Sequence, residues 1–162
     1  MTTFEHQSST PTPTTSRPID ARGPRFGAAV TTAVLALTLL SIPSALSLVL
    51  LSIQTVVFAL GALVGVHAQP YGVFFRKVVR PRPRLAAPTR FEDPAPPRFA
   101  QTVGLGFAIV GLIGLVSGAT VVAYVAVGFA LAAAFLNAAF DFCLGCEMYL
   151  LGKRTFAGRS AA

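Results

Sequence analysis

The sequence has few charged residues and no tryptophan. Asp, Glu, Lys and Arg make up only 12% of the 162 residues, and Asp and Glu together number six. Soluble globular domains carry about 25% charged residues, so this scarcity excludes an ordinary soluble fold. The chain is also 54% hydrophobic, with a mean hydropathy of +0.68. These values predict an integral membrane protein.

Charge is missing altogether from two long stretches, residues 27–75 and 99–140. The hydrocarbon core of a bilayer takes roughly 20 helical residues to cross, so each stretch is long enough for two spans and a tight turn. The sequence therefore predicts an all-α, polytopic membrane protein of two tandem helical hairpins. The expected transmembrane helices cover residues 24–42, 45–68, 97–116 and 119–140.

Outside the spans the composition is polar and rich in proline. Residues 1–18 are mostly Ser, Thr and Pro, which predicts a disordered cytoplasmic tail. Residues 81–96 alternate prolines with arginines and are typical of an extended, basic cytoplasmic linker. The linker separates a first membrane unit, residues 19–80, from a second unit, residues 97–153, and residues 154–162 form a second cytoplasmic tail.

The segment after Pro70 separates into an apolar and a basic face. This pattern is typical of a short helix that lies in the membrane interface. The apolar face holds Tyr71, Phe74, Phe75 and Val78, and the basic face holds Arg76, Lys77 and Arg80.

The two membrane units repeat each other at a constant offset of 73 residues. Both begin with Asp-x-x-x-Pro-Arg-Phe, at residues 20–26 and 93–99, and Gly72 falls on Gly145. Two spans per unit imply a parallel repeat about a pseudo-twofold axis along the membrane normal. The register aligns Pro70 and Val73 with Cys143 and Cys146, so only the second unit carries thiols.

Small residues four apart recur at matching positions in the second and fourth spans. Gly61 and Gly65 align with Ala134 and Ala138. Such pairs let two helix backbones approach closely, so we expect these two spans to cross through them.

The basic residues set the orientation. All 13 Lys and Arg residues lie in the tails, the linker, the interfacial segment or the first residues of a span, and none lies in the two short turns. The positive-inside rule then places both termini and the linker in the cytoplasm, with the protein in the inner (plasma) membrane. The net charge of +7 predicts anionic lipid headgroups as a partner, and no nucleic acid.

Arg25 and Arg98 stand at the cytoplasmic starts of the first and third spans. Free N–H groups and the helix dipole at such ends favour an anion or a lipid headgroup. Alternatively, Asp20 and Asp93 could pair with these arginines and fix the start of each hairpin, which is the interpretation we prefer.

The sequence resembles a known family in four places, over residues 19–153. These are residues 22–26, residues 70–72, residues 92–94 with 97–101, and the segment Phe-Cys-Leu-Gly-Cys-Glu-Met-Tyr at 142–149. The family consists of small four-helix bacterial membrane proteins, mainly actinobacterial, known as a domain of unknown function. Some of its members are encoded beside thiosulfate sulfurtransferases or thioredoxin-like proteins. The resemblance therefore implies thiol or sulfur chemistry and such a cytoplasmic partner, but no defined activity.

Cys143 and Cys146 are the candidate functional pair. Residues three apart share one face of a helix, so the two sulfurs could form a disulfide, carry a persulfide or bind a soft metal. The cytoplasm keeps thiols reduced, so a permanent structural disulfide is not expected. A helix that starts near residue 142 would favour a thiolate at Cys143. Asp141 and Glu147 would oppose that charge, although Glu147 could instead accept the thiol proton. The alternative is that both cysteines only pack at a helix end.

A metal site would need further ligands. His67 aligns with Phe140 and could join Cys143, Cys146 and Glu147 in a four-ligand set. This spacing matches no recognised zinc pattern. We therefore expect neither a metal nor a cofactor.

Three functions fit the sequence. The first is a membrane thiol protein that exchanges electrons or sulfane sulfur with a thioredoxin-like or sulfurtransferase partner. The second is a homo-oligomeric carrier of a small sulfur-containing solute, although the spans hold no ionisable residue of the kind that ion paths use. The third is a non-catalytic scaffold. Whether the protein is an enzyme stays open.

Overall fold

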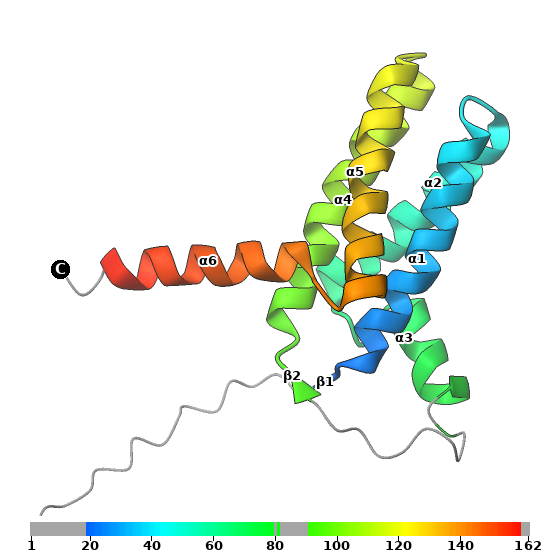
Figure 1. Ribbon diagram of the computed structural model, residues 1–162. Helices are drawn as coiled ribbons and strands as arrows, with labels where there is room; N and C mark the ends of the chain where they lie inside the picture. The colour runs from blue at the N-terminus through cyan, green and yellow to red at the C-terminus, as the bar shows by residue number, and fades with distance from the viewer. Residues whose placement is uncertain (1–18, 80, 82–90, 160–162) are drawn as a thin grey trace, which may run out of the picture.

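Four long helices stand side by side in the computed structural model of the protein, and a further helix runs away from them (Figure 1). The structure describes residues 19–79, 81 and 91–159, with side chains up to residue 155. The predicted N-terminal tail, most of the predicted linker, Arg80 and residues 160–162 lie outside that range. All four long helices are long and apolar enough to cross a membrane, which confirms the expectation of a helical membrane protein. They are α1 (Arg22–Ser41), α2 (Ala45–Ala59) continued by the π-helical turn η1 (Leu60–Val64), α4 (Ala95–Val116) and α5 (Thr120–Phe140).

The four helices form a ring in the order α1, α2, α4, α5. α1 packs against α2 and α5, and α4 packs against the same two helices, so α2 and α5 lie at opposite corners. The predicted crossing of the second and fourth spans is therefore wrong among the described residues. Gly61 instead lies against α4, where a Cβ atom at Gly61 would stand 2.8 Å from Cγ of Gln101.

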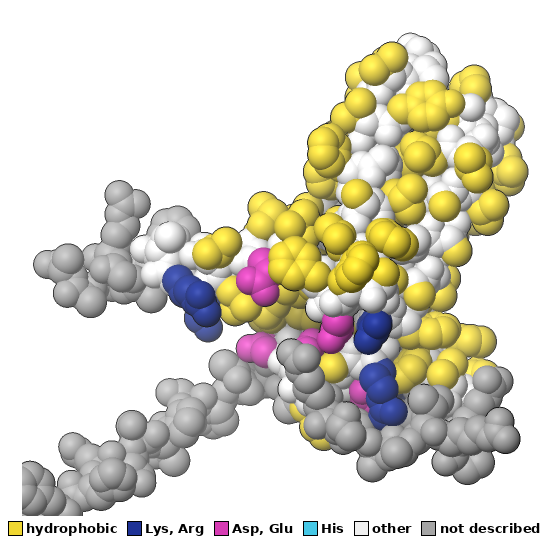
Figure 2. Space-filling model, viewed as in Figure 1, with side chains coloured by type: hydrophobic (Ala, Val, Ile, Leu, Met, Phe, Trp, Pro, Cys, Tyr) yellow, Lys and Arg dark blue, Asp and Glu magenta, His cyan; other side chains and the backbone are white. Residues whose placement is uncertain are grey.

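The hydrophobic core lies between these helices. Leu35, Leu51, Phe58 and Val127 are buried at its centre. Phe58 reaches α4 because Gly104 has no side chain, and a Cβ atom at Gly104 would lie 2.8 Å from the Phe58 ring. Large apolar side chains also cover the outside of the bundle, and charged side chains gather at one end of it (Figure 2). An apolar belt with charges at one end is the surface expected of a bundle that spans lipid.

Gly65 ends the second span earlier than the predicted limit at residue 68. Its φ of 121° is a backbone conformation that side chains rarely permit, and its N–H donates to the carbonyl of Leu60 over 3.0 Å. The chain therefore leaves the helix direction at Gly65.

Two short strands join the start of the first half of the chain, which holds α1 and α2, to the start of the second half, which holds α4 and α5. β1 (Ile19–Asp20) pairs antiparallel with β2 (Phe91–Glu92), with Ile19 opposite Glu92. The end of the predicted linker thus contains a strand and the first turn of α4. The strand pair holds the starts of α1 and α4 at the charged end of the bundle.

The segment after Pro70 is helical, as predicted, and part of its apolar face packs onto the bundle, whereas Phe74 and Val78 remain exposed. It consists of α3 (Pro70–Phe74) and a second π-helical turn, η2 (Phe75–Val79). Phe75 is buried, and the Phe26 ring lies 5.6 Å from the Phe75 ring and 6.1 Å from the Phe74 ring. The first unit therefore closes its end of the bundle with its own aromatic side chains.

Candidate functional site

The chain turns sharply at the end of α5. Asp141 adopts the left-handed conformation, with φ 57° and ψ 25°, and its N–H donates to the carbonyl of Leu136. The N–H of Phe142 donates to the same carbonyl over 3.3 Å. The hydrogen bonds satisfy the last turn of α5 and redirect the chain toward α4.

Cys143 stands immediately before the last helix, α6 (Leu144–Arg159). Its Sγ atom accepts a hydrogen bond from the N–H of Cys146 over 3.3 Å, and its carbonyl accepts one from the N–H of Glu147 over 3.0 Å. The sulfur atoms of Cys143 and Cys146 are joined in a disulfide. Both residues are partly exposed. The two sulfurs are thus within bonding distance at the start of a helix, as the spacing predicts.

α6 is held against α4 near its first turn. A Cβ atom at Gly145 would lie 2.7 Å from both Cα and Cβ of Ala100, so only glycine permits this approach. The rings of Phe99 and Tyr149 also pack together, with centroids 5.8 Å apart. From this contact α6 projects away from the bundle (Figure 1) and continues to Arg159, past the predicted end of the unit at residue 153.

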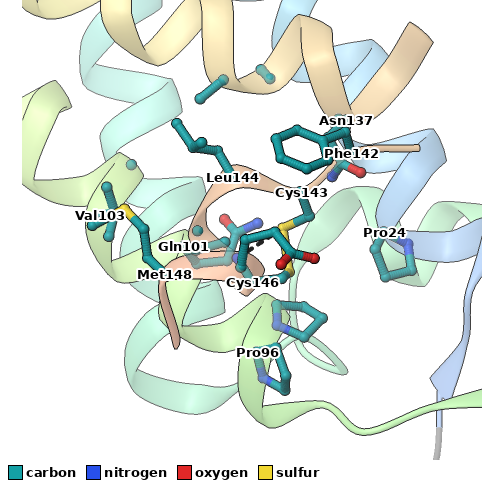
Figure 3. Close-up of a pocket in the computed structure, with 18 of the residues that line it drawn as sticks. Pro24, Pro96, Gln101, Val103, Asn137, Phe142, Cys143, Leu144, Cys146 and Met148 are labelled. Atoms are coloured by element: carbon teal, nitrogen blue, oxygen red, sulfur yellow. Dashed lines mark hydrogen bonds between the residues drawn. A yellow bond between two sulfur atoms is a disulfide. The ribbon is translucent and has the colours of Figure 1, made fainter. Parts of the chain in front are cut away.

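The disulfide lines a cavity of about 530 Å³. α1, α4, α5 and the start of α6 form its wall, and Figure 3 shows Cys143 and Cys146 among Gln101, Asn137 and Phe142. Apolar side chains of the spans form another part of the wall: Phe58, Phe107, Phe129 and Ala130. Sequence reasoning missed this cavity because no local pattern reports the space left between helices that are distant in the chain.

Acidic side chains outnumber basic ones in the wall of the cavity. Glu92, Asp93, Asp141 and Glu147 line it, against a single arginine, Arg25. Glu147, the predicted proton acceptor, is exposed and lies next to Cys146 in this wall.

Arg25 and Arg98 contact helix ends rather than the neighbouring acids. Nε of Arg25 donates to the carbonyl of Ala138, near the end of α5, over 3.1 Å. Nε and Nη2 of Arg98 donate to the carbonyls of Ala62 and Leu63, at the end of η1, over 2.7 and 2.9 Å. Each arginine thus binds the negative, C-terminal end of the second span in the other half of the chain.

The predicted pairing of Asp20 and Asp93 with these arginines is therefore wrong. Asp20 forms its salt bridge with Arg22, over 3.1 Å. An oxygen of Asp93 accepts the backbone N–H of Ala95 over 2.9 Å. The carboxylates stabilise the first turn of the helix that follows each of them.

Three glutamines and Tyr71 form polar contacts inside the charged end of the bundle. Gln54 is fully buried, and its Oε1 accepts a hydrogen bond from the Tyr71 hydroxyl over 3.0 Å. Burial raises the pKa of Tyr71, so the hydroxyl stays protonated as a donor. Nε2 of Gln69 donates to Oε1 of Gln101 over 3.1 Å. These contacts join α3 and the turn before it to α2 and α4.

His67 does not join the cysteines. It lines a separate cavity of about 120 Å³ beside Gly72 and Arg76, and its carbonyl accepts a hydrogen bond from Arg76 over 2.7 Å. In the part of the chain that the structure describes, no three His, Cys, Asp or Glu side chains come together as a metal site. The four-ligand set considered from the sequence is therefore not assembled.

The fold and this site define a class: a four-helix protein of membrane-spanning character with a Cys-x-x-Cys disulfide in the wall of a cavity between its helices. The chain belongs to the family described as Domain of unknown function (DUF4395), whose profile matches residues 19–154. No curated protein and no solved structure matched the chain.

Proposed function

We propose that the protein is a membrane thiol–disulfide carrier in which Cys143 and Cys146 exchange electrons with a cytoplasmic protein dithiol of the thioredoxin type. The observation that carries this proposal is the place of the disulfide. It lies at the N-terminal end of α6, partly exposed, with Sγ of Cys143 accepting the N–H of Cys146.

This place suits thiol chemistry. When the disulfide is reduced, the same N–H group and the dipole of α6 stabilise a thiolate on Cys143. Cys146 is then close enough to close the disulfide again. The exposed carboxylate of Glu147 is available to accept a proton from solvent-facing thiols.

The exchange follows the usual two steps. A thiolate of the partner attacks one sulfur of the disulfide, forms a mixed disulfide and releases the other sulfur as a thiolate. The second thiol of the partner then attacks the mixed disulfide and releases Cys143 and Cys146 as a dithiol. Two electrons pass to the membrane protein, and the partner leaves as a disulfide.

The orientation of the protein in the membrane is a further part of the proposal. Arg25, Arg76 and Arg98 lie at the end of the bundle that holds the disulfide, and the positive-inside rule assigns that end to the cytoplasm. α6 exposes Leu144, Met148 and Leu151 at helical spacing, which suits a helix lying among anionic lipid headgroups.

The proposal also includes the tandem repeat of the two membrane units. Asp20 and Asp93 each accept the backbone N–H two residues further on, over 3.1 and 2.9 Å. Arg25 and Arg98, 73 residues apart, each bind the second span of the opposite half. The matching contacts support a 2+2 arrangement in which only the second unit carries the working thiols.

A trapping experiment tests the exchange. A thioredoxin whose second active-site cysteine is replaced by serine cannot resolve a mixed disulfide, so it should stay bound to the purified protein. A Cys143→Ser, Cys146→Ser double variant is the control and should trap none. If the wild-type protein also traps none, it does not exchange thiols with this class of partner.

A further inference from the structure

The cavity beside the disulfide lies partly within the membrane-spanning helices. Its wall includes Phe58 of α2, Phe107 of α4 and Phe129 of α5, and the disulfide lines the same space. A volume of about 530 Å³ is within the range of small-molecule sites. A ligand there would touch both apolar span residues and the two sulfurs.

Most residues of the wall are apolar, and two contribute neutral amide groups, which suits a neutral, largely apolar molecule. Arg25 is the one basic residue in this wall, and its Nε donates to the carbonyl of Ala138, so the wall offers little to bind an anion such as thiosulfate. Asn137 and Gln101 contribute amide groups to the wall (Figure 3). Gln101 uses its oxygen to accept a hydrogen bond from Gln69, so its NH₂ group is the donor on that side chain. Amide donors in an apolar, aromatic-lined space suit a ligand with carbonyl oxygens.

We propose that this cavity binds the head of a lipid-soluble quinone, which takes two electrons from reduced Cys143 and Cys146. This inference rests on the proposed thiol function and names the second substrate of the same site. A protein dithiol on the aqueous side and a quinone in the cavity would give the disulfide one electron donor and one acceptor.

The step balances without a further reactant. The two S–H bonds of Cys143 and Cys146 break and one S–S bond forms. The two electrons and two protons released pass to the quinone, whose carbonyl oxygens each gain one O–H bond. The thiols are oxidised to the disulfide seen in the structure, and the quinone is reduced to its quinol.

The test follows reoxidation of the reduced, full-length protein in detergent. The protein is reduced, freed of reductant under anaerobic conditions and mixed with a benzoquinone that carries a short alkyl tail and is fully substituted, so that it has no free ring position to which a thiol can add. We expect one quinol per disulfide formed, from quinone absorbance and from loss of free thiols. The proposal would be overturned if the thiols of the wild-type protein did not react with the quinone. It would also be overturned if phospholipid occupied the cavity in preference to the quinone.

Two alanines of α5 supply a matched pair of variants. Ala133 lines the cavity, whereas Ala132 is exposed on the outside of the same helix. Ala133→Phe should slow reoxidation roughly tenfold or more, the scale on which a pocket rejects added bulk. Ala132→Phe should leave it unchanged. Equal rates in both variants would mean that the quinone reacts outside the cavity, and would overturn the proposal.

A second variant covers the case in which Ala133→Phe does not fold. Asn137→Leu keeps the size of the side chain but removes a donor from the cavity wall. It should raise the quinone concentration needed for half-maximal rate and leave reduction by the thioredoxin-type dithiol unchanged. Reduction by that dithiol without any reoxidation by quinone would refute the quinone site alone. Failure of the reduction step would refute the proposed function itself.

Discussion

Replacing Gly145 with alanine should displace α6 and with it the disulfide. The added Cβ atom would lie 2.7 Å from both Cα and Cβ of Ala100. Carbon atoms in contact sit about 3.5–4.0 Å apart, so the methyl group is roughly an ångström too close. Cα of Ala100 belongs to the backbone of α4 and cannot rotate away. α6 must therefore shift outward.

Overpacking of this kind costs about 1–3 kcal/mol. For a chain of this length, each kcal/mol corresponds to a change of roughly 2–4 °C in melting temperature. Gly145→Ala should therefore lower the melting temperature in detergent by several degrees. The shifted helix should also change the rate at which a small dithiol reduces the disulfide.

Gly152→Ala is the matched control, because Gly152 lies on the same helix with nothing within 4 Å of its Cβ position. Alanine is favoured over glycine inside a helix by up to about 1 kcal/mol, so this variant should be as stable as the wild type or slightly more stable. The reasoning fails if Gly145→Ala and Gly152→Ala melt alike and their disulfides are reduced at the same rate.

Two further predictions concern side-chain contacts at the charged end of the helical bundle. Tyr71→Phe leaves the buried Gln54 without its donor and should cost about 1–3 kcal/mol by thermal unfolding. Burial raises the folded-state pKa of Tyr71 above its ordinary value of 10.0, so this contribution is complete below about pH 10 and falls as the pH rises further. Tyr71→Phe should lack that alkaline loss, and an identical alkaline profile in both proteins would contradict the assignment. Arg98→Met should destabilise more than Arg25→Met, because Arg98 makes two hydrogen bonds to helix-end carbonyls and Arg25 makes one. Equal melting temperatures would show that these bonds contribute little.

The sequence predicted the elements far better than their contacts. Uncharged length predicts spans directly, because a bilayer demands it, and the turns near Pro43 and Gly118 were placed correctly. The three-residue spacing also predicted that the sulfurs of Cys143 and Cys146 could meet. These features depend on neighbouring residues alone.

The sequence did not predict which residues contact each other across long separations in the chain. Arg25 and Arg98 were expected to pair with nearby aspartates, yet each reaches a helix end in the opposite half. Gly61 was assigned to α5 and instead packs on Gln101 of α4. The partner that each of these residues contacts depends on the order of the helices around the ring, which hydropathy and spacing do not encode. The cavity follows from the same arrangement.

The most direct test of the central claim is the redox state and sidedness of the two cysteines in membranes. Vesicles of known orientation are treated with oxidant or dithiol and then with a membrane-impermeant maleimide mass tag. The account predicts two tags on the reduced protein from the cytoplasmic side, none on the oxidised protein, and return of the tags after re-reduction. Thiols that take two tags after every treatment, or only from the opposite side, would contradict a reversible Cys143–Cys146 disulfide at the cytoplasmic face.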